Sequence, residues 1–212
     1  MDCRIGSGIM VRSRHLALGL TLLACTPGGS EPAPALSMPR FELRLSGAEE
    51  KSLIGRPFVA ATVAEGWIEL DPVTGTLTSR PRTPVLFYPS DLAQPEMLTI
   101  DLIGVLEPTS YAAYADGDYA RRTHFLSTYS MRRPNGLARH FLLSGGTVVI
   151  TAVHASHITG TVTIQFGGYI DPVPGSTEQA PMVPAPLSIT GTFTAAFMPG
   201  ARIAEDAQLP SR

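Results

Sequence analysis

The sequence predicts an all-β protein, with a single antiparallel β-sandwich or flattened barrel of about ten short strands and only minor helix. Three observations predict this fold. The 20 Gly and 19 Pro among the 212 residues are spread without a short period, which suits many strands joined by turns. Apolar residues recur at every second position from residue 41 onward. No long segment has the 3.6-residue apolar period of a helix.

The first 24 residues have the order of an export signal. Arg12 and Arg14 precede an apolar run at 16–24, which is followed by Cys25. This run is about half of the roughly 20 residues that a membrane-crossing helix needs. Met10 begins this pattern and is a more conventional start than Met1. We therefore expect a cleaved signal peptide whose true start is Met10.

The end of the apolar run, Leu22-Leu23-Ala24-Cys25, resembles the lipobox of bacterial lipoproteins. The resemblance implies that Cys25 is lipidated and becomes the first residue of the mature chain, with the membrane as its partner. Several acyl chains exceed what stable membrane attachment requires. Thr26 stands where aspartate would resemble an inner-membrane retention signal, so the resemblance points to the outer membrane.

Residues 25–40 follow as a segment rich in Pro and Gly, with little to bury. This composition predicts an unstructured tether that would hold the next domain on the order of 20 Å from the lipid surface. The sequence is long enough for one well-cored domain, which we expect at 41–198. The tail at 199–212 is predicted to be disordered.

The strands of the domain are predicted from period-2 alternation. The firmest two, at 158–166 and 187–197, contain the nearly identical hexamers 158–163 (ITGTVT) and 189–194 (ITGTFT). Each hexamer places a glycine on the apolar face, where we expect a large neighbour, and we predict that this neighbour is a buried Trp67. The other predicted strands are 41–45, 58–63, 67–70, 85–88, 97–104, 123–130, 139–143 and 147–153.

The connections between these strands follow from shorter signals. The polar break at 154–157 predicts an antiparallel hairpin between 147–153 and 158–166. Capping-box spacing at 46–49 and the segment 110–115 are the places where a helical turn is expected. The proline-rich segment 171–186 is predicted to be an exposed loop.

Charge and cysteine content exclude some functions. A net charge of −2 is too small to hold the many phosphates of a nucleic acid, so we expect no nucleic-acid partner. Both cysteines, Cys3 and Cys25, lie in the leader, so the domain has no disulfide and no thiolate metal site. We expect no cofactor. Asp116-Gly-Asp118 is too short for a calcium loop and is interpreted as a turn.

One stretch gathers tyrosines and arginines. Between Tyr119 and Ile170 there are five arginines and no acid, and tyrosines precede them. Together they are candidates for binding a glycan or an anionic polymer of the envelope, although tyrosines also fill cores and arginines protect strand edges. The candidate residues are Tyr111, Tyr114, Tyr119, Arg121, Arg122, Arg132, Arg133 and Arg139.

Evidence for metal or catalytic chemistry is sparse. His154 and His157 lie at the predicted hairpin turn, but two ligands do not make a metal site. The sequence has no G-x-S-x-G, and Ser144 has no identified base. We therefore expect a non-enzymatic structural or binding domain with an envelope polymer or protein as partner. The alternative is an exported hydrolase, indicated if His124 or His140 lies in a cleft against a carboxylate and a serine.

Overall fold

The computed structural model describes residues 38–70, 74–90, 96–114, 122–133, 137–172 and 180–200. These residues form ten strands and no helix, so the predicted all-β fold is confirmed. The strands are β1 (Arg40–Gly47), β2 (Lys51–Val59), β3 (Val63–Leu70), β4 (Leu77–Pro89), β5 (Glu96–Ile103), β6 (Ser110–Ala113), β7 (His124–Arg132), β8 (Ala138–Val153), β9 (His157–Ile170) and β10 (Val183–Phe197).

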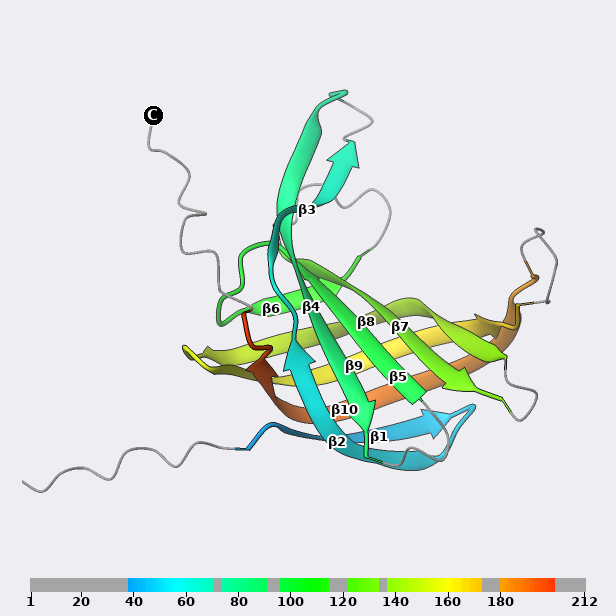
Figure 1. The fold of residues 1–212 in the computed structure, drawn as a ribbon. Coiled ribbons are helices and arrows are strands. Elements are labelled where there is room, and N and C mark those ends of the chain that lie inside the picture. Colours follow the sequence, from blue (N-terminus) through cyan, green and yellow to red (C-terminus); the bar gives the residue numbers. More distant parts are fainter. Residues whose placement is uncertain are drawn as a thin grey trace, which may run out of the picture. The chain divides into compact units, whose positions relative to one another are not determined.

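Eight of these strands close into a ring, as in a flattened barrel (Figure 1). The ring follows chain order, from β1 through β2, β4, β5, β7, β8 and β9 to β10, and every neighbouring pair is antiparallel. Pairing of β1 with β10, from Arg40 opposite Thr194 to Gly47 opposite Leu187, closes it. Closure leaves these eight strands without a free edge.

The two remaining strands are additions to the ring. Strand β6 pairs with both β7 and β8 over a few residues. Strand β3 pairs only with β4 among the described strands, and the first residues of β4 extend beyond the ring to form a two-stranded unit with it (Figure 1). We call this unit, made of β3 and residues 77–80 of β4, the ribbon.

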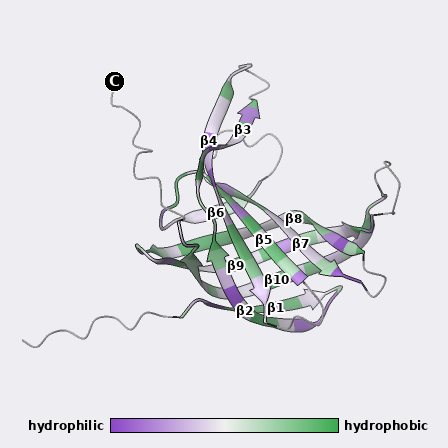
Figure 2. Ribbon diagram, viewed as in Figure 1, coloured by the Kyte–Doolittle hydropathy of each residue, from purple (hydrophilic) through white to green (hydrophobic). Residues whose placement is uncertain are grey.

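Inward-facing side chains pack the interior of the ring with a hydrophobic core. Buried and exposed residues alternate along β1 and β9, and hydrophobic and hydrophilic residues accordingly alternate along the strands in Figure 2. The largest fully buried side chains are Tyr111, Tyr129, Phe41, Phe87, Phe125, Phe141, Phe166, Leu43, Leu45, Leu98, Ile100 and Leu102. Because this core packs the ring, a binding site is expected on the outer surface of the ring or at its ends.

The strands predicted at the two hexamers are confirmed, but Trp67 does not lie over their glycines. Thr159, Thr161 and Thr163 lie opposite Thr194, Thr192 and Thr190 on the outer face. This register places Gly160 opposite Phe193 and Gly191 opposite Val162 on the inner face. The ring of Phe193 occupies the space that a Cβ on Gly160 would fill. The large neighbour is therefore Phe193, and the predicted burial of Trp67 is wrong because Trp67 is only partly buried, on the ribbon.

Several predicted boundaries are also corrected. The helical turns expected at 46–49 and 110–115 are absent from the described part of these segments, since β1 runs to Gly47 and β6 occupies Ser110–Ala113. The strand predicted at 58–63 is wrong for most of its length, because β2 ends at Val59 and β3 begins only at Val63. The predicted strands 139–143 and 147–153 are one strand, β8, with bulges near Leu143. A β-bulge inserts an extra residue without ending a strand, so β8 continues through the glycine pair at 145–146.

One connection matches its prediction, and the other is shorter than predicted in the part that is described. Strands β8 and β9 form the expected antiparallel hairpin, in which the His154 amide donates to the His157 carbonyl. The loop predicted at 171–186 gives way to β10 at Val183, and residues 173–179 lie outside the described residues. Within the described ranges, no helix has the length and apolar character needed to cross a membrane.

Candidate functional site

The tyrosine- and arginine-rich stretch does not form one surface. Strand β7 runs through it and spans nine residues, so its ends are about 27 Å apart. Tyr111, Tyr114 and Arg122 lie near the start of β7, whereas Arg132, Arg133 and Arg139 lie near its end. Tyr119 and Arg121 lie outside the described residues, as do Cys25 and Asp116-Gly-Asp118. The described candidates therefore divide into two groups.

Tyr111 belongs to the core. Its side chain is fully buried, and its hydroxyl donates a 2.6 Å hydrogen bond to the Val105 carbonyl. Burial raises the pKa of Tyr111 to about 12, because the charged phenolate would lose its hydration. In this arrangement its ring cannot stack on an external ligand.

Tyr114 joins an aromatic and charged group on the outer face, which we call the Trp67 cluster. The cluster comprises Trp67, Glu69, Arg80, Arg82, Asp101, Tyr114 and His124. Arg82 and His124 flank Ile103 in the sheet register, so β4, β5 and β7 form the floor of the cluster. Trp67 on β3 packs edge-on against Tyr114 and His124, with ring centroids 5.5 and 6.0 Å away.

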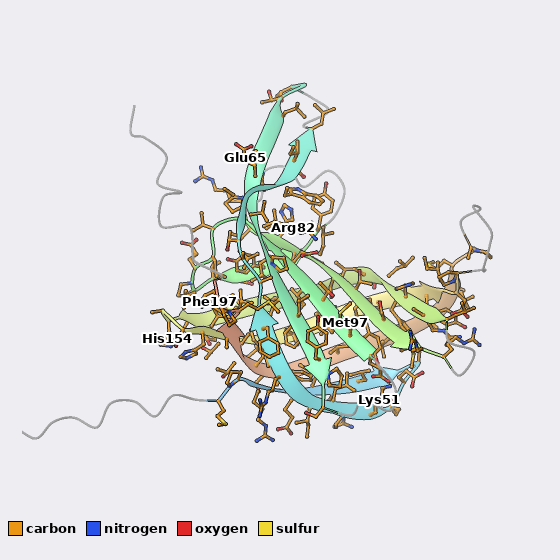
Figure 3. All side chains as sticks on the ribbon, in the orientation of Figure 1. Lys51, Glu65, Arg82, Met97, His154 and Phe197 are labelled. Carbon is orange, nitrogen blue, oxygen red and sulfur yellow. The ribbon has the colours of Figure 1, made fainter. Side chains whose placement is uncertain are left out.

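Carboxylates hold both arginines of the Trp67 cluster. Asp101 accepts a 2.9 Å hydrogen bond from Arg82, and Glu69 lies 3.6 Å from the Arg80 guanidinium. The acids are largely buried, while the Arg82 side chain remains 43% exposed. Figure 3 shows Arg82 at the base of the ribbon. The cluster thus presents an oriented guanidinium beside two partly buried aromatic rings.

Buried polar atoms that have no hydrogen bond within the described part of the chain gather in the same cluster. They include the indole nitrogen of Trp67, both carboxylate oxygens of Glu69, Nε of Arg82 and Oδ1 of Asp101. A buried polar atom without any partner costs about 1–3 kcal/mol, and Glu69 Oε2 retains its ion pair with Arg80. Most buried polar groups in proteins are satisfied, so this concentration distinguishes the Trp67 cluster from the other described residues.

The second arginine group surrounds Asp171, next to the end of β9, and we call it the Asp171 cluster. Arg139 donates from Nε and Nη2 to the two carboxylate oxygens of Asp171 at 2.9 and 3.1 Å. Arg133 donates to the same carboxylate at 2.8 Å, and the Arg139 guanidinium lies 3.6 Å from the ring centroid of Tyr169. These contacts lower the pKa of Asp171, with the Arg139 hydrogen bond as the main cause.

The Asp171 cluster is thus largely self-satisfied. One carboxylate engages two of the arginines predicted to bind an anion, and the third, Arg132, is exposed. Because Asp171 offsets part of the charge of Arg133 and Arg139, the positive field here is smaller than the sequence alone predicted. The Trp67 cluster, with its unsatisfied atoms, is the better candidate for a binding site.

The conditions for a hydrolase are met only in part. His124 is buried among the aromatic rings of the Trp67 cluster. His140 Nδ1 lies 2.8 Å from the Ser130 hydroxyl, as cross-strand neighbours on β8 and β7. The Ser130 backbone lies in the sheet between Met97 and His140. Neighbouring amides therefore donate hydrogen bonds within the sheet and do not form an oxyanion site. Ser144 is exposed in the β8 bulge.

The predicted histidine pair lies at the β8–β9 turn. The rings of His154 and His157 are stacked, with centroids 4.4 Å apart, and His157 Nδ1 lies 3.1 Å from the Ser156 hydroxyl. Desolvation, followed by the repulsion of His154, lowers the pKa of His157. Across the described ranges, no three His, Cys, Asp or Glu side chains are grouped to hold a metal ion.

A shallow hollow of about 530 Å³ lies over the threonine hexamers. Its polar lining includes Thr159, Thr161, Thr192 and Thr194. The two phenylalanines of its lining are almost completely buried, so the hollow offers hydroxyl groups but little aromatic surface for stacking.

Sequence reasoning missed most of the Trp67 cluster. Arg82 and Asp101 occupy outward positions between inward-facing residues of β4 and β5, and alternation alone predicts such positions to be polar. Alternation does not predict that the two residues are diagonal neighbours, because that depends on the register between strands. Asp171 was missed for the same reason, since Arg139 contacts it across the β8–β9 pair.

No family model matches this chain, and the searches of curated proteins and of solved structures return no significant match.

Proposed function

We propose that this chain is a lipid-anchored, non-enzymatic binding protein of the cell envelope, with its ligand held at the Trp67 cluster. The anchor is the lipidated Cys25 that the lipobox resemblance implies, and the outer membrane is the expected location. The segment 25–40 acts as the tether between the lipid and the domain.

A single observation carries the binding proposal: unsatisfied buried polar atoms gather beside partly exposed aromatic rings. A carbohydrate segment of an envelope polymer has the matching chemistry. Its hydroxyls both donate and accept hydrogen bonds, and its C–H faces stack on Trp67 and Tyr114. Arg82, fixed by Asp101, supplies a charge-assisted donor for a hydroxyl or an acidic sugar.

Binding is testable with the chain's own fluorescence, because Trp67 is its only tryptophan. Titration with soluble peptidoglycan fragments or outer-membrane polysaccharide is expected to change the emission. Trp67→Ala, followed by calorimetry, should weaken binding about tenfold or more. Tyr88→Ala is the control, since Tyr88 is an exposed aromatic on the ring. Equal affinities for both variants and the wild type would refute this site.

The anchor is tested separately by palmitate labelling with cell fractionation. Wild type is expected in the membrane fraction with label, and Cys25→Ala is expected without label. A wild-type chain that is unlabelled and soluble would exclude lipidation, whatever the outcome of the glycan titration.

The Ser130–His140 contact supports one alternative, an exported hydrolase. A fluorophosphonate probe followed by peptide mass analysis distinguishes it from a binding domain. The binding proposal predicts an unmodified Ser130, because the serine lacks an identified oxyanion site. A covalent adduct on Ser130 that disappears in His140→Ala would favour the hydrolase.

A further inference from the structure

Glu69 is a buried acid whose oxygens are poorly satisfied. It is 6% exposed, and neither of its carboxylate oxygens has a hydrogen bond within the described ranges. Its ion pair with Arg80, at 3.6 Å, is longer than a hydrogen bond. Glu96, another largely buried acid, instead accepts hydrogen bonds from Lys51 and Tyr129. Glu69 can therefore accept hydrogen bonds from a group that approaches it.

Aromatic rings lie on the same side of the ribbon as Glu69. The register of β3 with β4 is regular from Trp67 to Leu70, so Trp67 and Glu69, two residues apart, share one face. The Trp67 ring lies 5.5 Å from that of Tyr114, and both residues are partly exposed. The faces of Trp and Tyr rings attract cations. An acid beside such rings fits a positively charged group that donates hydrogen bonds.

The arginines of the Trp67 cluster are matched by acids. Arg82 donates a 2.9 Å hydrogen bond to Asp101, and Arg80 forms the longer ion pair with Glu69. These four side chains carry no net charge, so together they do not repel an incoming cation as a basic patch would. Charged N–H groups at hydrogen-bonding distance would also satisfy the Glu69 oxygens better than the present 3.6 Å contact.

The position of Glu69 allows a ligand to reach it. The ribbon extends beyond the ring (Figure 1), and Glu69 is not part of the hydrophobic core cluster. Its neighbours Ile68 and Leu70 are 65% and 54% exposed, so this part of β3 lies at the surface. Rotation of the Glu69 side chain can therefore bring its carboxylate to a ligand without moving a core residue.

We propose that the glycan bound at the Trp67 cluster is an amino sugar with a free, unacetylated amine, and that Glu69 binds this ammonium group. The assignment rests on the proposed function, because it takes the Trp67 cluster as the glycan site. An ammonium group offers three N–H donors and a positive charge, whereas a hydroxyl offers one donor. The C–H face of the sugar stacks on Trp67. Glu69 thus selects amino sugars over their acetylated forms.

Two sugar oligomers that differ only in acetylation test this selection in the full chain. One is a short oligomer of glucosamine, and the other is the same oligomer with every amine acetylated. Trp67 emission and calorimetry measure binding in a mildly acidic buffer that keeps the free amines charged. We expect the wild type to bind the glucosamine oligomer about tenfold or more tightly than the acetylated one. This comparison requires no variant.

Glu69→Gln tests whether Glu69 is responsible. The variant keeps the size of the side chain but removes its charge, so its affinities for the two oligomers should agree within about twofold. Glu65→Gln is the matched control, because it removes the same charge from an exposed position of β3 (Figure 3) and should retain the preference. Urea unfolding verifies that both variants are folded. Loss of the preference in both would indicate general charge attraction and overturn the role of Glu69.

The remaining outcomes separate the amino-sugar proposal from the glycan site itself. Equal or tighter binding of the acetylated oligomer by the wild type would overturn the ammonium at Glu69 and leave the glycan site standing. Trilysine, which offers ammonium groups without a sugar face, should bind about tenfold or more weakly than the glucosamine oligomer, and equal binding would overturn the amino sugar as ligand. If neither oligomer bound, the proposal would fail, and titration with envelope polysaccharide would decide the glycan site separately.

Discussion

At the scale of single residues, Asp171 shows how one acid organises a basic region. Arg139 contacts both of its carboxylate oxygens while stacking on Tyr169, and Arg133 contacts one of them. A paired guanidinium and carboxylate in fixed geometry contributes more than an ordinary surface ion pair. Asp171 therefore pairs with two of the arginines at this end of the ring.

We predict that Asp171→Asn lowers the free energy of unfolding at pH 7 by about 1 kcal/mol. Because the folded pKa of Asp171 is lowered, its stabilising effect exists above the unfolded pKa of about 3.9 and is lost as pH falls through the folded pKa. Urea denaturation at pH 7 and near pH 2 should therefore show a difference that shrinks in acid.

The matched control for this prediction is Glu42→Gln. Glu42 forms a 3.7 Å ion pair with Arg40, in which both side chains are mostly exposed, so little change is expected. If the effect of Asp171→Asn were equally large in acid, loss of the ionised carboxylate would not be its cause.

At the scale of elements, the two hexamers show why glycine occurs on an apolar strand face. In the antiparallel register, Gly160 lies opposite Phe193 and Gly191 lies opposite Val162. Phe193 fills the space over Gly160, and Phe41 similarly lies over Gly55 on the neighbouring pair β1–β2. Aromatic residues opposite glycines help to fix strand register.

We predict that Gly160→Ala lowers the free energy of unfolding by about 1–3 kcal/mol. The added Cβ would lie 2.5 Å from the Val149 carbonyl oxygen and 2.8 Å from the Phe193 ring. Gly145→Ala is the control, because its nearest neighbour is a flexible side-chain atom 3.3 Å away. Thermal or urea unfolding measures both variants, and equal stabilities would contradict the packing of Phe193 on Gly160.

At the scale of the whole molecule, the last step of the architecture is closure of the ring by β1 and β10. This pairing joins the first described strand to the last one, so the contact is distant in sequence. The hairpin of β8 and β9 is local by comparison. Distant contacts carry a larger loop-closure entropy, which favours their late formation during folding.

We predict that Leu43→Ala, in the closing strand β1, lowers the free energy of unfolding by about 2–5 kcal/mol because Leu43 is fully buried. Most of this loss should appear as faster unfolding, with little change in the folding rate. Chevron analysis measures both rates. Val162→Ala in β9 is the comparison and should slow folding more, whereas an equal slowing by Leu43→Ala would contradict late closure.

The sequence predicted the strands better than it predicted the site. Alternation located β1, β5, β7, β9 and β10 because the two faces of each strand meet different environments. It missed the first half of β4, in which Pro81 and Pro84 resemble a break. The carbonyls of these prolines still accept hydrogen bonds, from Gly104 and Ala60, so the strand continues through them.

By itself, the sequence determined the all-β class and the β8–β9 hairpin, since both depend on neighbours along the chain. Only the tertiary structure decided that the sheet closes and that Arg82 meets Asp101 while Tyr111 enters the core. The physical reason is that side-chain period is a local property of a strand. Register and strand order depend on hydrogen bonds between segments far apart in the chain.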